Sequence, residues 1–141
     1  MIKVKQVHSR TDLEDVFTIR RKVFVEEQKV PADLEYDDYD DEGAVHYVAT
    51  LNGKIVGAAR WITTDEGYKL QRFAVLPEAR GNGVGSELVK TVLDDIPSDG
   101  KKIYLHSQES AVGLYLRHGF VIEGERFEEA GIGHYKMVLK M

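Results

Sequence analysis

The sequence contains no cysteine, and this absence excludes disulfide bonds, thiolate metal ligands and a cysteine nucleophile. No apolar run approaches the roughly 18 residues that a membrane-spanning helix requires. The N-terminal segment alternates in polarity and lacks the unbroken apolar stretch of a signal peptide. The chain also lacks an excess of positive charge. Its net charge is −5, and this disfavours nonspecific binding to nucleic acid. We therefore expect a cytoplasmic protein that binds neither membranes nor nucleic acid.

The residues that are present fit one globular domain spanning residues 1–141. Hydrophobic residues make up 43% of the chain and charged residues 30%, which is ordinary for a soluble protein. A chain of this length buries a core without help from disulfides or a structural metal.

The most informative motif is Arg80-Gly81-Asn82-Gly83-Val84-Gly85, which follows a strand-like run, Gln71–Val75, and opens a helix-like run, Val84–Ile96. A glycine-rich turn between strand and helix aims backbone N–H groups at a phosphate. No lysine follows Gly85 as in nucleotide hydrolases, and the glycines do not follow the dinucleotide spacing. The motif predicts a phosphorylated ligand, with a simple turn before a helix as the alternative.

Periodicity and turn residues predict ten elements in the order β-α-β-β-β-α-β-α-β-β. A capping box at Thr11 and Glu14 predicts a helix that runs to about Val25, and Asn52-Gly53 predicts a hairpin turn. The predicted strands are the alternating segment at Ile2–Gln6, then His46–Leu51, Lys54–Ile62, Tyr68–Val75, Lys102–His106, Phe120–Phe127 and His134–Lys140, and the two later helices are Val84–Ile96 and Ser110–His118. This order favours an α/β (α+β) fold in which helices flank one central, mixed, mostly antiparallel sheet.

The order and the motifs resemble the GNAT superfamily of acetyl-CoA-dependent N-acetyltransferases. The family motif [R/Q]-x-x-G-x-[G/A] after the fourth strand is matched in full by residues 80–85. A second motif, N-x-x-A-x-x-[L/F]-Y-x-x-x-G-F, is matched by residues 108–120, except that Gln108 replaces asparagine. Residues 23–28, 37–46 and 130–134 look like the small bacterial ElaA-like branch.

The resemblance implies an acetyl-CoA site and no metal. The glycine loop would hold the pyrophosphate, Arg80 would add charge, and the fourth strand would pair with the pantetheine arm. The implied binding residues are Phe73, Ala74, Val75, Arg80, Gly81, Asn82, Gly83, Val84, Gly85, Ser86, Gln108 and Ala111.

Acetyl transfer needs a base for the amine, a donor for the oxyanion and an acid for the thiolate. Tyr115 matches the family tyrosine that stands near the thioester sulfur, and we expect it to be the general acid. The oxyanion donor would be a backbone N–H near Ala74 or Val75. The fourth strand carries no glutamate for the base, so His106 is our first candidate because it ends a strand.

His46, His134, Glu35 and a water molecule remain open as other sources of the base. Arg72 is expected to pair with an acid. The acidic run Glu35–Glu42 is either a lip that attracts a cationic amine or a solvated loop. Its spacing does not follow the calcium pattern.

The sequence thus predicts an N-acetyltransferase that moves acetyl from acetyl-CoA to a primary amine by direct attack in a ternary complex. The acceptor is not identified: we expect a small molecule, and a small metabolite, a polyamine, an amino sugar and a protein amine all remain open. A non-catalytic acyl-CoA-binding protein on the same fold is the alternative, and a different phosphate-ligand protein is a weaker one. Exposed edge strands leave a homodimer open.

Overall fold

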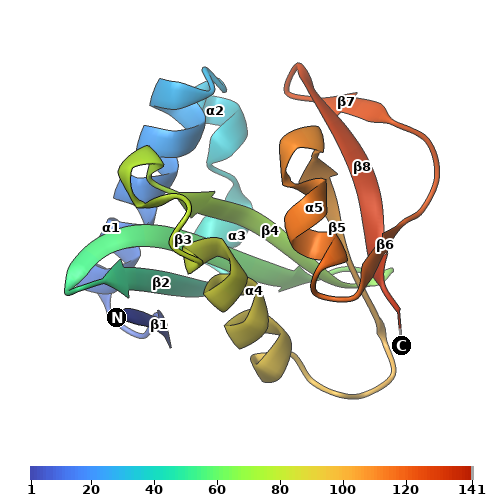
Figure 1. The fold of residues 1–141 in the computed structure, drawn as a ribbon, viewed down its shortest axis with the longest axis horizontal. Helices are drawn as coiled ribbons and strands as arrows, with labels where there is room; N and C mark the ends of the chain where they lie inside the picture. The colour runs from blue at the N-terminus through green and yellow to red at the C-terminus, as the bar shows by residue number, and fades with distance from the viewer. Residues whose placement is uncertain (141) are drawn as a thin grey trace.

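The computed structural model describes residues 1–140 and confirms the mixed α/β architecture (Figure 1). Its strands are β1 Ile2–Gln6, β2 Val45–Leu51, β3 Lys54–Thr63, β4 Gly67–Val75, β5 Lys102–Gln108, β6 Phe120–Ile122, β7 Phe127–Glu129 and β8 Ile132–Leu139. Its helices are α1 Arg10–Arg20, α2 Ala32–Glu35, α3 Asp38–Asp41, α4 Val84–Asp95 and α5 Val112–Leu116. A π-helix, η1 Arg21–Glu27, continues α1, and the 3₁₀ turns η2 Pro77–Ala79 and η3 Glu109–Ala111 precede α4 and α5.

One sheet joins all strands of the described chain in the order β1-β2-β3-β4-β5-β8-β6, with β7 also paired to β8. The β4–β5 pair is parallel and every other pair is antiparallel. Parallel neighbours need a crossover connection, and α4 provides it between β4 and β5. The sheet therefore consists of two antiparallel halves that meet at β4 and β5.

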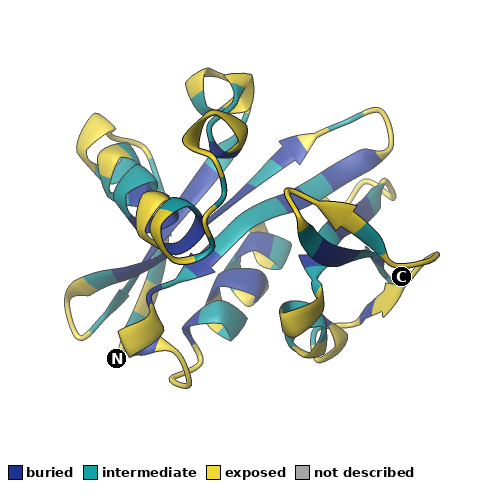
Figure 2. Ribbon diagram, turned by 90° about the horizontal axis from the view of Figure 1, so that it is seen from above, coloured by how far each residue is buried: buried dark blue, intermediate teal, exposed yellow. Residues whose placement is uncertain are grey.

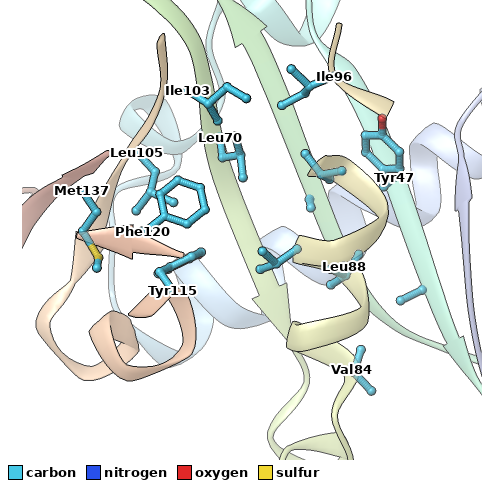
Figure 3. Close-up of a cluster of buried hydrophobic side chains, with 14 of the residues drawn as sticks. Tyr47, Leu70, Val84, Leu88, Ile96, Ile103, Leu105, Tyr115, Phe120 and Met137 are labelled. Atoms are coloured by element: carbon cyan, nitrogen blue, oxygen red, sulfur yellow. The ribbon is translucent and has the colours of Figure 1, made fainter. Parts of the chain in front are cut away.

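Two helices cover opposite faces of the N-terminal half of the sheet (Figures 1 and 2). The apolar stripe of α4, with Val84, Leu88, Val89 and Val92, packs against one face (Figure 3). The apolar side of α1 and η1 packs against the other face, where Val48, Ala58 and Ala74 lie. Because both faces are covered, β2 and β3 bury successive residues from Tyr47 to Ala49 and from Val56 to Arg60.

Several predicted boundaries were wrong. Ser9 caps the first helix instead of Thr11, because Ser9 has extended backbone angles and its side chain accepts from the N–H of Asp12 at 3.1 Å. The helical segment continues as a π-helix to Glu27, beyond the predicted end at Val25. The acidic loop contains the two short helices α2 and α3.

The predicted strand Phe120–Phe127 is two strands, β6 and β7, so the sheet has one strand more than the sequence pattern indicated. Gly124, with φ of 89°, turns the chain between them. Both strands pair with β8, and Val121 lies opposite Val138 while Glu128 lies opposite Gly133. The predicted helix Ser110–His118 is likewise a 3₁₀ turn followed by the short α5.

The strands β4 and β5 separate soon after they meet. Their pairing runs from Gly67 opposite Lys102 to Leu70 opposite Leu105 and goes no further in the described chain. Beyond that point β4 contains a bulge, because Ala58 pairs with Ala74 while Arg60 pairs with Gln71. Arg72 takes a φ of 57° in this bulge. The edge of β4 that faces β5 is therefore left without a strand partner.

Among residues 1–140, no helix is long and apolar enough to cross a membrane.

Gly67 makes the closest backbone contact at the start of the β4–β5 pair. A Cβ atom at this position would overlap the carbonyl oxygen of Lys102. We expect Gly67→Ala to destabilise the protein by about 3 kcal/mol or more, because the clash is with backbone that cannot rotate away. Gly53→Ala is the control, since Gly53 also has positive φ but nothing lies within 4 Å of the added atom. We expect it to cost about 1 kcal/mol. Urea unfolding measures both, and equal costs would contradict the steric argument.

Candidate functional site

The separation of β4 and β5 leaves a cavity of about 430 Å³ between the two halves of the sheet. Residues of β4 and β5 form its sides, and Tyr115 of α5 contributes to its wall. The segment from Phe24 to Glu35 forms one lip, and the β7–β8 turn forms the other. A cavity of this size, lined by both apolar and ionisable side chains, fits a small molecule.

Tyr115 lies where the cavity meets the main core. Its ring packs edge-on against Phe73 and Phe120, with centroid distances of 6.0 and 5.9 Å, and it belongs to the cluster drawn in Figure 3. Its hydroxyl has no hydrogen-bond partner among residues 1–140, although the side chain lines the cavity. Burial raises the pKa of Tyr115, so the phenol stays protonated at neutral pH.

His106 lies on the opposite side of the cavity, in contact with a carboxylate that the sequence analysis did not single out. The Nδ1 atom of His106 is 3.2 Å from Oε1 of Glu129, at the end of β7. The other oxygen of Glu129 is 3.7 Å from Nε2 of His134, whose Nδ1 donates to the carbonyl of Ile132 at 2.7 Å. The hydrogen bond with His106 lowers the pKa of Glu129, so this carboxylate is ionised at neutral pH.

The glycine loop has the geometry that the motif predicts for a ligand-binding turn. Gly81 and Gly83 have φ of 83° and 86°, and α4 begins directly after Gly83. A Cβ on Gly81 would meet no atom within 4 Å, so there is open space beside the backbone. Asn82 donates from Nδ2 to the carbonyl of Ala79 at 2.9 Å and stabilises the turn. The first N–H groups of α4 remain available to an anion.

Other residues expected to bind the cofactor already have partners. Arg80 donates to both oxygens of Glu27 at 2.7 Å and from Nε to the carbonyl of Val75 at 3.0 Å. The hydroxyl of Ser86 is 2.7 Å from Nε2 of His118. Any contact of Arg80 or Ser86 with a ligand therefore competes with these bonds.

The remaining expected residues divide between cavity and core. Phe73, Gln108 and Ala111 line the cavity, whereas Val75 and Gly85 do not. The amide of Gln108 donates to Gln28 at 2.8 Å and accepts from it at 3.3 Å, which ties β5 to the end of η1. The side chains of Ala74 and Val84 are buried in the two cores, so only their backbone groups are available.

The acidic run matches neither of its two interpretations as a whole. Asp38, Asp41 and Glu42 are exposed, as expected of a solvated loop. The other three carboxylates are bound by three arginines in a charge-balanced group that we call the arginine–carboxylate cluster, made of Arg20, Arg60, Arg72, Glu35, Asp37 and Asp40. The charge of these three carboxylates is balanced by the three arginines, which weakens the interpretation of the run as a lip that attracts cations.

The arginine–carboxylate cluster fixes one lip of the cavity. Arg20 is 1% exposed and donates to Glu35 at 2.7 Å and to Asp40 at 2.6 Å. Arg60 is fully buried and donates to Asp37 at 2.7 Å and to Asp40 at 2.8 Å. These bonds hold α2 and α3 against α1 and β3. Arg72 pairs with acids, as the sequence analysis expected.

The cluster also contacts two residues that the sequence left open as the base, Glu35 and His46. Glu35 is 2% exposed, and its carboxylate accepts from Arg20 and faces Arg72 at 3.4 Å, so its oxygens are already engaged by two arginines. His46 lies outside the cavity lining, 3.8 Å from Asp40, and both of its ring nitrogens are buried without a hydrogen-bond partner. His134 lines the cavity but shares Glu129 with His106.

Sequence reasoning missed Lys69, Glu129 and Gln28, which all line the cavity. No local motif marks them, since they come from β4, β7 and the end of η1. The alternation of polar and apolar residues in β4 was the available signal for Lys69. This lysine lies between the buried Tyr68 and Leu70, so its side chain points to the opposite face of the sheet. No group of three or more metal-ligating side chains occurs in the described part of the chain.

Comparison with known proteins agrees with this geometry. The family model for an acetyltransferase (GNAT) domain matches residues 6–141. YjcF of Bacillus subtilis, named as an uncharacterised N-acetyltransferase, is 40% identical over 129 residues, which cover 89% of this chain and 91% of YjcF. The crystal structure of Escherichia coli ElaA superposes with a TM-score of 0.87 at 29% identity, covering 99% of this chain and 100% of ElaA. An acyl-CoA N-acyltransferase from Pseudomonas aeruginosa gives 0.86 at 26% identity, with 99% and 100% coverage.

The chain therefore belongs to the GNAT acetyltransferase family, as its two motifs predicted. The similarity to ElaA confirms the finer resemblance to that branch. Family membership identifies the protein as an acyltransferase.

The unpartnered His46 makes stability depend on pH. Burial lowers its pKa from 6.5 to about 4, with the positive charge of Arg20 adding to the effect. Between these values the unfolded chain binds a proton that the folded chain does not, so stability falls as the pH falls from about 6.5 to about 4, by up to about 3 kcal/mol.

We expect His46→Leu to flatten urea-unfolding stability across this window, and His8→Leu, at an exposed histidine, to leave the slope unchanged. The pKa of Asp37 is lowered in the folded protein by its hydrogen bonds with Arg60. Burial opposes the lowering of the pKa at Asp40, but its bonds with Arg20 outweigh it, so the contribution of both carboxylates is lost only at lower pH. An unchanged slope in His46→Leu would contradict this assignment.

Proposed function

We propose that the protein transfers an acetyl group from acetyl-CoA to a primary amine by direct attack in a ternary complex. The observation that carries the proposal is the cavity between β4 and β5, whose walls include both Tyr115 and His106. Direct attack is the natural route because the chain has no cysteine to carry an acyl intermediate.

The free edge of β4 supports binding of the pantetheine arm. The N–H of Leu76 donates to Val56 of β3, so the alternation along the strand turns the backbone groups of Val75 and Phe73 toward β5. The bond from Arg80 to the carbonyl of Val75 agrees with this orientation. An amide-bearing ligand that added itself to this edge would bond to Phe73 and Val75. The open space at Gly81 suits the pyrophosphate at the start of α4.

Each proton of the reaction has a group to receive or supply it. His106 takes the proton of the attacking ammonium, the free amine forms the new N–C bond, and the C–S bond breaks. Tyr115 gives its proton to the departing sulfur, and its raised pKa keeps that proton available. The second proton of the nitrogen is released to solvent as the amide forms, and the Tyr115 oxygen takes up a proton from solvent, which completes the proton balance. Of the two expected oxyanion donors, the N–H of Val75 is favoured over that of Ala74 because it faces the free edge.

Glu129 would select the tautomer that His106 needs as a base. A carboxylate only accepts hydrogen bonds, so the contact of 3.2 Å requires the proton of the neutral ring on Nδ1. The lone pair then lies on Nε2, where it is able to take the proton of the acceptor.

Release of free CoA thiol from acetyl-CoA, measured across a panel of amines, tests the proposed reaction. Amine-dependent release would support it. Thermal protection by acetyl-CoA without release for any amine would favour the alternative of a non-catalytic acyl-CoA-binding protein.

We expect Tyr115→Phe to keep the affinity for acetyl-CoA, because the ring still packs against Phe73 and Phe120, while turnover falls by about 10- to 100-fold. Thermal shift with acetyl-CoA measures the first effect and thiol release the second. Unchanged turnover would remove Tyr115 from the mechanism.

We expect Glu129→Ala to lower kcat by about 10- to 100-fold with little change in KM for acetyl-CoA, because His106 loses its tautomer control. ¹⁵N NMR of the imidazole should report Nδ1–H in the unmodified protein and a mixture in the variant. Glu129→Gln keeps an acceptor oxygen and should recover part of the activity. Glu128→Ala is the control, since Glu128 is the exposed neighbour on β7 and reaches only Arg126, at 3.8 Å. Equal effects of the two alanine variants would count against the role of Glu129.

A further inference from the structure

Lys69 is a cation in the cavity wall that has no ion-pair partner within the described chain. It lies in β4 opposite Tyr104, just before the strands separate, and lines the cavity. Its ammonium makes no hydrogen bond within the described chain, and no carboxylate there lies within 4.0 Å of it, the limit for an ion pair. Burial lowers the pKa of Lys69, and the negative charge of Glu129 opposes this shift.

The other charged groups that line the cavity have partners. Glu35 is bound by Arg20. Arg72 donates to the carbonyl of Glu35 at 3.2 Å and faces Asp37 at 3.4 Å. Glu129 is engaged with His106. Partial burial of an unpaired ammonium is unfavourable, and a negative group brought in by a ligand would reverse that cost.

Lys69 also lies on the same face of the sheet as the candidate base. In the parallel register Lys69 pairs with Tyr104, and His106 follows two residues later, so all three side chains project from one face. An acceptor whose amine reached His106 would thus have Lys69 beside it.

We propose that the acceptor amine carries an anionic group, a carboxylate or a phosphate, that pairs with Lys69. This inference rests on the proposed acetyl transfer and narrows its acceptor to amino-acid-like or phosphorylated amines. It disfavours polyamines, because the acids expected to attract them are neutralised in the arginine–carboxylate cluster. Apolar Val30 and Leu34 on the nearby lip offer a surface for the rest of such a molecule.

Matched pairs of amines that differ in the anionic group test the inference. Lysine is compared with cadaverine, ornithine with putrescine and leucine with isoamylamine, and phosphoethanolamine is compared with ethanolamine to separate phosphate from carboxylate. CoA thiol release at fixed acetyl-CoA gives kcat/KM for each amine. We expect the anionic member of at least one pair to be preferred by about 10- to 100-fold, the range of a hydrogen bond to a charged group.

Variants of Lys69 then assign the preference to this side chain. Lys69→Gln should raise KM for the preferred amine with an anionic group by about 10- to 100-fold and leave KM for the counterpart that lacks this group within about twofold. Lys69→Arg should retain most of the preference. Lys90→Gln is the control, because Lys90 is exposed on α4 and does not line the cavity. Thermal protection by acetyl-CoA should be the same in all three variants.

The outcomes separate this inference from the function on which it rests. Equal use of both members of every pair, or a preference for the diamines, would overturn the anionic acceptor and leave acetyl transfer standing. A preference for anionic amines that survives in Lys69→Gln would overturn the role of Lys69. Absence of release with every amine would contradict acetyl transfer itself, and the inference with it.

Discussion

The whole site depends on how little of β4 is paired with β5. In the described chain the two halves of the sheet are joined from Gly67 to Leu70 on one side and from Lys102 to Leu105 on the other. The bulge at Arg72 then bends β4 at the point where the pairing stops. Unpaired strand edges usually invite aggregation. Here the unpaired stretch is enclosed by neighbouring elements and becomes a cavity wall, so its backbone groups face the cavity instead of another strand.

The arginine–carboxylate cluster fixes a polar segment against α1 and β3. The segment from Pro31 to Ala44 has few apolar residues, and its helices α2 and α3 are each a single turn. Buried ion pairs contribute little net stability, since desolvation offsets their attraction, but they demand one geometry. Arg20 and Arg60 share Asp40, so α1, α3 and β3 are held in one arrangement. That arrangement sets the lip that carries Leu34.

The electrostatics of the cavity follow from this arrangement. The carboxylates of the arginine–carboxylate cluster are paired with arginines, and Lys69, His106 and the ionised Glu129 remain at the cavity wall. Tyr115 stays neutral because it is buried. Lys69, His106 and Tyr115 come from β4, β5 and α5, each on a regular element and not on a mobile loop, which suits chemistry that requires fixed distances. The glycine loop lies outside the cavity lining and offers chiefly backbone groups, with Asn82 stabilising the turn.

Local sequence determined the elements that depend on local forces. The spacing of Val84, Leu88, Val89 and Val92 predicted α4 because a helix repeats every 3.6 residues, and the glycines of the loop predicted a turn with positive φ. The two motifs then predicted the fold and the family. Residues far apart in the chain decided the rest. Glu129 meets His106, Gln28 meets Gln108 and Arg20 meets Glu35 only after the sheet has formed. The acidic run shows the limit most clearly, because its charge is visible in the sequence whereas its neutralisation depends on arginines that folding brings beneath it.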